Sequence, residues 1–304
     1  MIEAVNLTKE FGTFTAVDNL SLNVAEGEVL ALLGPNGAGK TTTVRMLGAI
    51  LQPSRGYARI AGYDTIQQAQ QVRQVIGLLT EFSGLYLRMS GLDYLRFFGE
   101  LQGLSPELIR HRSLELLERF ELSEAGAKRV GTYSKGMKQK LSLVRALLHD
   151  PLVLFLDEPT SAMDPHSAKL VRDMMAELKQ KKRTIVLCTH NLAEAEQLAD
   201  RIAVIRQGRL ITQGTALELK QQWLGDPIME LRLAAPLNGW LADLETSLKV
   251  VAHGPDWLRY AVPDPARSNP LLLTELIERR LPVLSLSEVS RSLEEVYLNL
   301  IEAH

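Results

Sequence analysis

Residues 34–41 form a glycine-rich loop, Gly-Pro-Asn-Gly-Ala-Gly-Lys-Thr, that matches the pattern G-x-x-x-x-G-K-[ST] at every fixed position. Backbone N–H groups can point inward around a phosphate chain here, because glycine has no Cβ to block the approach. The helix expected after the loop adds the positive end of its dipole. Lys40 can reach the β- and γ-phosphates of a nucleotide, and the Thr41 hydroxyl can ligate Mg²⁺. The predicted phosphate-loop contacts are Gly34, Pro35, Asn36, Gly37, Ala38, Gly39, Lys40, Thr41 and Thr42.

Two adjacent carboxylates follow a fully apolar strand expected over residues 152–156. Asp157 is a predicted Mg²⁺ ligand, directly or through water, and Glu158 is predicted to polarise the water that attacks the γ-phosphate. Alone, the two acids would fit an ordinary turn at a strand end, just as the glycine loop alone would fit a turn between strand and helix. Their presence in one chain favours phosphoryl chemistry.

The order of elements indicates how these loops are positioned. Strands are expected at 2–7, 21–24, 28–33, 57–60, 75–79, 152–156, 184–188, 202–205 and 209–212. Helices expected at 42–50, 164–181 and 192–199 alternate with them, which indicates an α/β fold with a mostly parallel sheet covered on both faces. Residues 91–149 are mostly helical in period and too long for one crossover. We therefore predict an inserted helical subdomain at about 85–150.

Composition excludes several classes of protein. The 304 residues, of which 46% are hydrophobic and 23% charged, suit about two soluble domains at roughly 150 residues each. The longest apolar runs are five residues, and a membrane span takes about 20. The start MIEAVNLTKE lacks a basic region and an apolar signal core, so secretion is not expected. A single cysteine, Cys188, fits a reducing cytoplasm, and the net charge of −2 argues against nucleic-acid binding.

The charge changes sign near residue 225. Residues 221–304 contain 7 Lys and Arg against 12 Asp and Glu, although the whole chain carries a net charge of only −2. The change coincides with the turn-rich stretch Leu-Gly-Asp-Pro at 224–227. We therefore predict domains over 1–224 and 225–304. The second has the predicted order strand, helix, strand, strand, helix, strand, helix, with the second helix expected over residues 270–280. This order is similar to a small ferredoxin-like α+β unit.

A third motif, Tyr-Ser-Lys-Gly-Met-Lys-Gln at 133–139, resembles the L-S-G-G-Q signature of ATP-binding cassette (ABC) ATPases. The whole span of residues 2–220 resembles one such cassette, with the family's order of motifs, which implies a P-loop NTPase fold. By this resemblance, the remaining site residues are the adenine-stacking Phe11, the signature residues Ser134 and Gly136 that contact the γ-phosphate of another subunit, Asp164 of the loop between the two sites, and the switch histidine His190.

The signature departs from the family's pattern at three positions. Tyr133 stands for leucine, Lys135 for the first glycine and Met137 for glutamine, whereas Ser134 and Gly136 are retained. By the resemblance, the retained residues are the phosphate contacts. A helix start suits this role, since it offers free N–H groups and a positive field to an anion.

The family's glutamine after the strand at 75–79 is also replaced. Glu81 stands near the expected position. A carboxylate can ligate Mg²⁺, but it cannot donate a hydrogen bond as an amide does. We predict that Glu81 is linked to Mg²⁺ together with Thr41 and Asp157.

One chain with one phosphate loop and one signature cannot complete a site alone. The resemblance therefore implies a second ABC subunit, identical or related. It also implies an ATPase that uses Mg²⁺ and energises transport through separately encoded integral-membrane permeases, most similar to the export-type bacterial branch. Such a subunit is cytoplasmic and peripheral on the inner face of the cell membrane. The alternatives are a soluble ABC ATPase acting on ribosomes or DNA repair, and a regulatory module that binds ATP without hydrolysing it.

Overall fold

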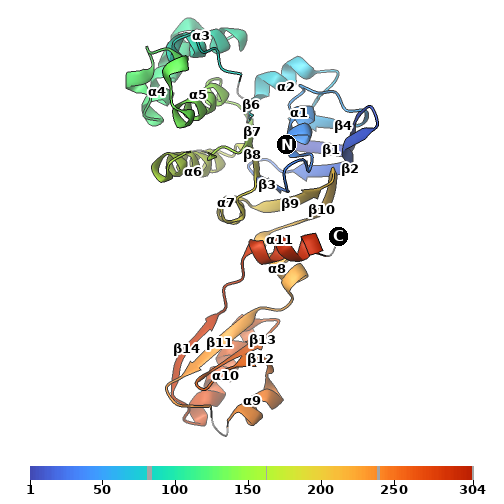
Figure 1. Cartoon of the computed structure of the whole chain (residues 1–304), viewed down its shortest axis with the longest axis vertical. Helices are drawn as coiled ribbons and strands as arrows, with labels where there is room; N and C mark the ends of the chain where they lie inside the picture. Colours follow the sequence, from blue (N-terminus) through green and yellow to red (C-terminus); the bar gives the residue numbers. More distant parts are fainter. Residues whose placement is uncertain (81–83, 162, 238–239, 303–304) are drawn as a thin grey trace. The chain divides into compact units, whose positions relative to one another are not determined.

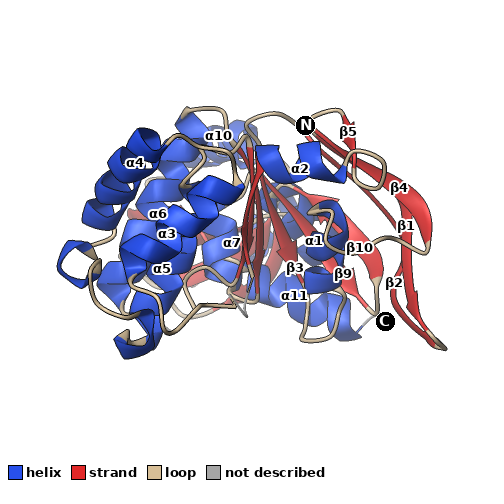
Figure 2. Ribbon diagram, turned by 90° about the horizontal axis from the view of Figure 1, so that it is seen from above, coloured by secondary structure: helices blue, strands red, loops and turns tan. Residues whose placement is uncertain are grey.

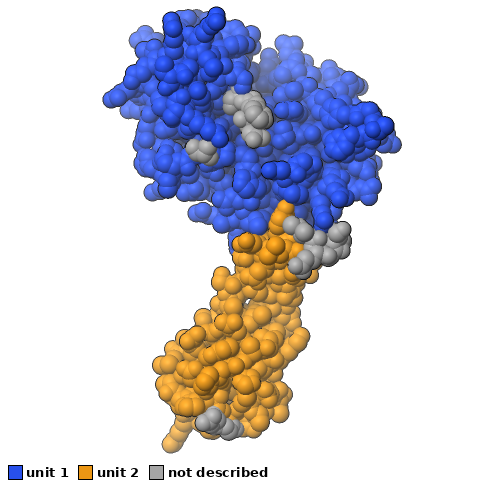
Figure 3. Space-filling view, viewed as in Figure 1, with its two compact units in different colours: residues 1–216 blue, residues 217–304 orange. Residues whose placement is uncertain are grey.

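The computed structural model describes residues 1–80, 84–161, 163–237 and 240–302, which form two compact units, 1–216 and 217–304 (Figure 3). The predicted boundary at 224/225 leaves helix α8 (Ala216–Leu224) in the first domain, whereas the contacts place nearly all of it in the second unit. The cause lies near the chain's end. The Arg291 guanidinium donates to the carbonyl oxygens of Leu224 (3.0 Å) and Gly225 (3.1 Å) and so holds the end of α8.

A six-stranded sheet forms the centre of the first unit, with strand order β10-β9-β3-β8-β7-β6 (Figure 1). All neighbours are parallel except the hairpin of β9 and β10, which confirms the predicted mostly parallel sheet. The strands are β3 (Val29–Leu33), β6 (Ile76–Leu79), β7 (Val153–Asp157), β8 (Thr184–Thr189), β9 (Arg201–Arg206) and β10 (Arg209–Gly214).

Helices cover both faces of this sheet (Figure 2). Helices α1 (Lys40–Leu47) and α2 (Ala69–Val75) lie on one face, and α6 (Pro165–Gln180) lies on the other, with α7 (Leu192–Leu198) following β8. Alternate residues of one strand enter different cores: Phe155 packs with the α1 cluster, and Leu154 packs with the α6 cluster. A strand buried on both faces needs such a continuous apolar run.

A second, antiparallel sheet has the order β2-β1-β4-β5. Its strands are β1 (Ile2–Phe11), β2 (Phe14–Val24), β4 (Arg55–Ile60) and β5 (Tyr63–Asp64). The alternation in this part of the sequence predicted strands but not a separate sheet. Antiparallel strands can leave one face in water, and the burial of β2 alternates in this way over its last residues.

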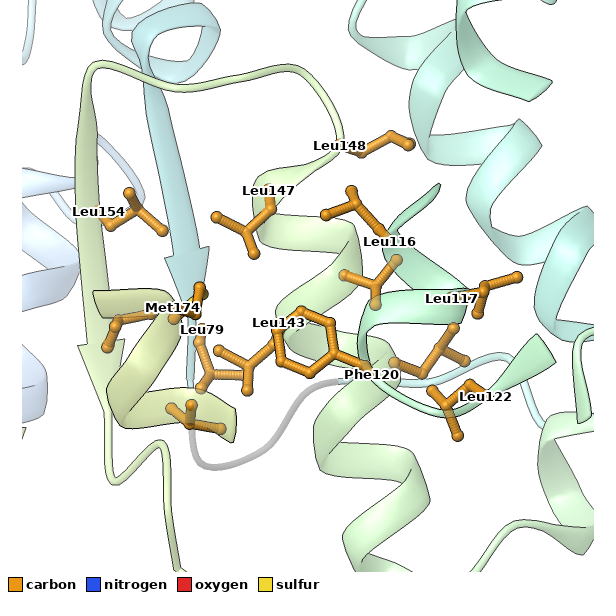
Figure 4. Packing of buried hydrophobic residues seen from close by; sticks show 14 of the residues in the cluster. Leu79, Leu116, Leu117, Phe120, Leu122, Leu143, Leu147, Leu148, Leu154 and Met174 are labelled. Carbon is orange, nitrogen blue, oxygen red and sulfur yellow. The ribbon is translucent and has the colours of Figure 1, made fainter. Parts of the chain in front are cut away.

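The helical subdomain contains α3 (Gly91–Leu101), α4 (Pro106–Arg119) and α5 (Lys135–Leu147). Its apolar side chains form one cluster with the central sheet rather than a core of their own (Figure 4). Each fully buried leucine or phenylalanine contributes about 1.5–3 kcal/mol, so the subdomain is anchored by packing on the sheet. The labelled members of the cluster are Leu79, Leu116, Leu117, Phe120, Leu122, Leu143, Leu147, Leu148, Leu154 and Met174.

The second unit has a four-stranded antiparallel sheet of order β12-β13-β11-β14. With its helices this is the split β-α-β arrangement of ferredoxin-like units. The elements are β11 (Ile228–Leu233), α9 (Leu241–Ser247), β12 (Lys249–His253), β13 (Trp257–Ala261), α10 (Pro265–Glu278), β14 (Val283–Glu288) and α11 (Leu293–Glu302).

Helix α10 begins earlier than the sequence predicted. The prediction started it at Pro270, but the structure starts it at Pro265, with the Asp264 carboxylate accepting from the N–H of Arg267 (3.2 Å). Both prolines follow a good capping residue, and the first start adds a turn of helix. Among the described residues, no helix is long and apolar enough to cross a membrane.

Candidate nucleotide-binding site

The phosphate loop lies at the carboxyl edge of the central sheet, between β3 and α1. Gly39 caps α1 in the left-handed region (φ 103°), and a Cβ there would lie 2.6 Å from the Ala16 carbonyl oxygen. Only glycine fits such a position without strain. The loop borders a pocket of about 330 Å³. The pocket is lined by Phe14, Ala16, Asn36, Gly37, Ala38, Gly39, Lys40, Thr41, Thr42, Asp157 and Glu158.

Lys40 is buried in this loop, with 7% of its surface exposed. Its ammonium group donates to the carbonyl oxygens of Gly34 and Pro35. These two predicted contacts therefore do not line the pocket but hold the lysine that does. Because both acceptors are uncharged, the positive charge of Lys40 stays available for a phosphate chain.

The carboxylates meet the loop where β3, β7 and β8 end side by side. Asp157 is 2% exposed, and its Oδ2 accepts from the Thr41 hydroxyl at 2.8 Å. Ends of adjacent parallel strands form the usual ligand edge of such a sheet. A hydroxyl and a carboxylate are the hard oxygen ligands that Mg²⁺ prefers, so this pair fits the ion. The described residues contain no group of three or more His, Cys, Asp or Glu side chains able to hold a metal.

Glu158 is fixed from several sides. Its backbone lies in the left-handed region (φ 51°), its N–H donates to the Cys188 carbonyl oxygen (2.8 Å) and its carbonyl oxygen accepts from the Gln139 amide (3.1 Å). A left-handed non-glycine residue costs about 1–3 kcal/mol and persists where its surroundings enforce it. The Glu158 carboxylate is joined to His190 Nδ1 by a hydrogen bond of 2.7 Å.

The structure thus brings Thr41, Asp157, Glu158 and His190 together beside Lys40. The signature residues lie elsewhere: Ser134 and Gly136 are not among the residues that line the pocket. Glu81 lies outside the described residues.

The start of α5 shows why the signature tolerates its tyrosine. The Ser134 hydroxyl caps the helix by accepting from the N–H of Met137 (3.2 Å). The ring of Tyr133 is buried, and its hydroxyl donates to the Ala125 carbonyl oxygen at 2.6 Å. Burial raises the pKa of Tyr133, so the hydroxyl stays a donor. Tyr133 therefore anchors the signature segment to the helical subdomain.

Asp164 begins α6, where its carboxylate accepts from the N–H of Ser167 (3.0 Å). This hydrogen bond, together with one from the Ser167 hydroxyl, lowers the pKa of Asp164 from 3.8 to about 2. Asp164, which the resemblance placed in the loop between the two sites, is thus a helix cap within its own chain, and its place in that loop stays a prediction.

The predicted adenine contact, Phe11, is half exposed at the end of β1, with the Lys9 ammonium 5.2 Å from its ring centroid. The aromatic residue that lines the pocket is Phe14, its partner across the hairpin. Sequence reasoning missed Phe14 and Ala16. Their only signal is that the β1–β2 hairpin ends near the loop, and this is a contact between distant segments.

Together, the loop, the buried lysine and the strand-end carboxylates define a P-loop nucleoside triphosphatase. The family described as ABC transporter matches residues 17–161. Over the full length of both chains, the protein is 38% identical to the uncharacterized ABC transporter ATP-binding protein YxlF of Bacillus subtilis (strain 168). It is 40% identical to the daunorubicin/doxorubicin resistance ATP-binding protein DrrA of Streptomyces peucetius, over 98% of this chain and 92% of that one.

Solved structures agree with these relatives. The ATP-binding subunit of an ABC transporter matches with a TM-score of 0.70 and 31% identity, covering 74% of this chain and 94% of that one. A dimeric ATP-binding cassette in a post-hydrolysis state, bound to ADP and Pi, matches with a TM-score of 0.66 and 25% identity, covering 71% and 98%. The chain belongs to the ABC transporter ATP-binding proteins. It is an ATPase with the cassette fold, as predicted, and the two alternative functions are not favoured.

Proposed function

We propose that this subunit hydrolyses ATP with Mg²⁺ at the interface of two ABC subunits and drives export through separate integral-membrane permeases. The single observation that carries the proposal is the pair of hydrogen bonds at the sheet edge, Thr41 to Asp157 and His190 to Glu158, beside the buried Lys40. The direction of transport is inferred from the resistance function in the name of the Streptomyces peucetius relative.

The residues divide the work of phosphoryl transfer. Lys40 and the loop N–H groups bind the phosphates, and Thr41 and Asp157 would hold Mg²⁺, which neutralises phosphate charge when bound. Glu158 orients the attacking water and accepts its hydrogen bond, and His190 keeps the Glu158 carboxylate in place. Glu81 stays a proposed third Mg²⁺-linked residue; a Glu81→Gln variant with unchanged Mg²⁺ dependence and turnover would refute that role.

The second half of each site is proposed to come from the other subunit. The capped start of α5 offers its N–H groups at Ser134 and Gly136, where no acidic side chain occupies the first turn. The dimeric cassette structure supports this arrangement for a similar protein. We infer that ATP joins the phosphate loop of one subunit to the signature of the next.

A docking surface for the permease is proposed where the sheet meets the helical subdomain. A pocket of about 190 Å³ there is lined by apolar residues such as Ile50, Leu78 and Phe98. Tyr86 and Leu87, on the segment before α3, are half exposed. An exposed apolar patch of this kind suits a cytoplasmic helix of a membrane subunit, which would keep this chain on the inner face of the membrane. A Leu87→Asp variant is expected to lose co-purification with detergent-solubilised membrane proteins while keeping ATPase activity.

The second unit is proposed to contribute to dimer contacts or regulation. On β11, the Glu230 carboxylate is held between Arg232 (2.7 Å) and Arg259 (2.8 Å), and these hydrogen bonds lower its pKa. Paired charged side chains on this sheet support a polar contact with another protein surface. If deletion of 217–304 left dimerisation, ATPase rate and transport all unchanged, this role would be refuted.

The experiment that tests the proposed function compares Glu158→Gln with wild type. The variant should bind ATP without hydrolysing it, so it should double its molar mass when Mg-ATP is added, whereas phosphate release should be lost. Glu26→Gln, which changes an exposed acid outside the pocket lining, is the control. A variant that stays monomeric with Mg-ATP would contradict the shared site.

A further inference from the structure

Glu194 is a buried carboxylic acid that none of the motifs includes. It lies on α7 with 4% of its surface exposed. Its Oε2 accepts from the Thr189 hydroxyl at 3.2 Å, whereas its Oε1 has no hydrogen-bond partner among the described residues. Burial of a carboxyl group costs free energy unless hydrogen bonds or charges compensate for it.

The hydrogen bond from Thr189 connects Glu194 to the loop that carries His190. The Thr189 hydroxyl donates to Glu194 and also accepts from the N–H of Asn191 at 3.0 Å. A hydroxyl has one hydrogen, so donation to Glu194 leaves its lone pairs turned to Asn191. The Asn191 side chain in turn accepts from the N–H of Glu194 at 3.1 Å. The residues on both sides of His190 are therefore held by one network.

The loop that carries Glu158 also acts on this carboxyl, because the Thr160 hydroxyl lowers the pKa of Glu194. Thr160 is two residues beyond Glu158, in a turn closed by the Ser161 N–H donating to the Glu158 carbonyl oxygen (3.2 Å). Glu194 thus lies between the segments that present the two members of the Glu158–His190 hydrogen bond.

The electrostatics fit a carboxyl that serves as a fixed acceptor. Burial raises the pKa of Glu194, and the charge of Glu158 acts in the same direction. The hydroxyls of Thr160 and Thr189 and the Arg172 guanidinium of α6 oppose this shift. The acceptor oxygen towards Thr189 is present in either protonation state.

We propose that Glu194 is a positioning residue for ATP hydrolysis, which fixes His190 against Glu158 by holding Thr189. The inference rests on the proposed roles of Glu158 and His190. Misplacing a group that aligns the reaction costs turnover rather than substrate binding.

The test measures kcat and KM for ATP in full-length Glu194→Ala and Glu194→Gln, each alone and combined with His190→Ala. Glu194→Ala should lower kcat by about tenfold or more, as expected for a misplaced reacting group, with KM unchanged. Glu194→Gln keeps an acceptor oxygen for Thr189 and should restore most of the turnover. Glu196→Gln, on the same helix, is the matched control and should behave as wild type.

The combination separates positioning from simple stabilisation. Because Glu194 acts through His190, Glu194→Ala should cost nothing more in a His190→Ala background. An equal loss of kcat in both backgrounds, or a Glu194→Gln variant as impaired as Glu194→Ala, would overturn the inference. A His190→Ala variant with wild-type turnover would instead show that the proposed role of His190 is wrong, and the inference would fall with it.

Discussion

Two helix starts in the first unit suit an anion, and they differ in what surrounds them. At α1 the cap is a left-handed glycine, the buried Lys40 follows and two carboxylates line the same pocket. At α5 the cap is the exposed Ser134. Neither helix has an acidic residue in its first turn. In the proposed mechanism, one start therefore combines phosphate binding with catalytic groups and the other supplies phosphate binding alone, as a site shared between two subunits requires.

The largest effect is expected from replacing Glu158, the proposed catalytic group beside the start of α1. Glu158→Gln should lower the ATPase kcat by about 10²–10⁴-fold, the usual contribution of a positioned base, without weakening ATP binding. A phosphate-release assay and a nucleotide-binding titration measure the two quantities. Turnover near the wild-type level would mean that another group orients the water.

Phe14 lines the pocket and Phe11 does not, so variants of the two residues test which aromatic side chain contacts the nucleotide. Phe14→Ala should raise KM for ATP by about 5- to 150-fold, because loss of an aromatic contact to a base costs roughly 1–3 kcal/mol. Phe11→Ala, which alters a residue outside the pocket lining, is the matched comparison, and steady-state kinetics measure both. A larger effect at Phe11 would restore the adenine role that its position in the sequence predicts.

A Tyr133→Phe variant tests whether the segment at the start of α5 depends on the hydrogen bond from the Tyr133 hydroxyl. Tyr133→Phe removes the donor to the Ala125 carbonyl oxygen and should destabilise folding by about 1–3 kcal/mol, the cost of a buried unsatisfied group. Denaturant unfolding measures it, with Tyr86→Phe as a half-exposed control. Equal stability of the two variants would show that the hydroxyl anchors nothing.

The smallest effect concerns acid stability. The folded-state pKa of Asp164 is depressed from 3.8 to about 2, so its stabilising contribution is present above 3.8 and is lost as the pH falls towards 2. Asp164→Asn keeps a good cap and removes this titration. Between these two pH values, the free energy of unfolding should depend less on pH in the variant than in wild type, and denaturant unfolding at several pH values measures it. Identical pH dependence would contradict the assigned pKa.

The sequence predicted the chemical groups of the site better than the contacts that position them. The spacing within 34–41 and the strand before Asp157 are local, so the loop and carboxylates followed from the pattern. The antiparallel sheet, the lining by Phe14 and the contacts of Glu194 depend on segments far apart in the chain. The division of contacts at 216/217 also depends on distant segments, because Arg291, far along the chain, holds the end of α8.

The central claim is that each chain carries two unlike halves of a site. Glu158→Gln and Ser134→Ala should each have little ATPase activity alone. In a mixed dimer, one site joins the intact loop side of the Ser134→Ala subunit to the intact signature of the Glu158→Gln subunit. Mixing the two variants in equal amounts should therefore restore ATPase activity. A mixture no more active than the average of its components would contradict the shared site.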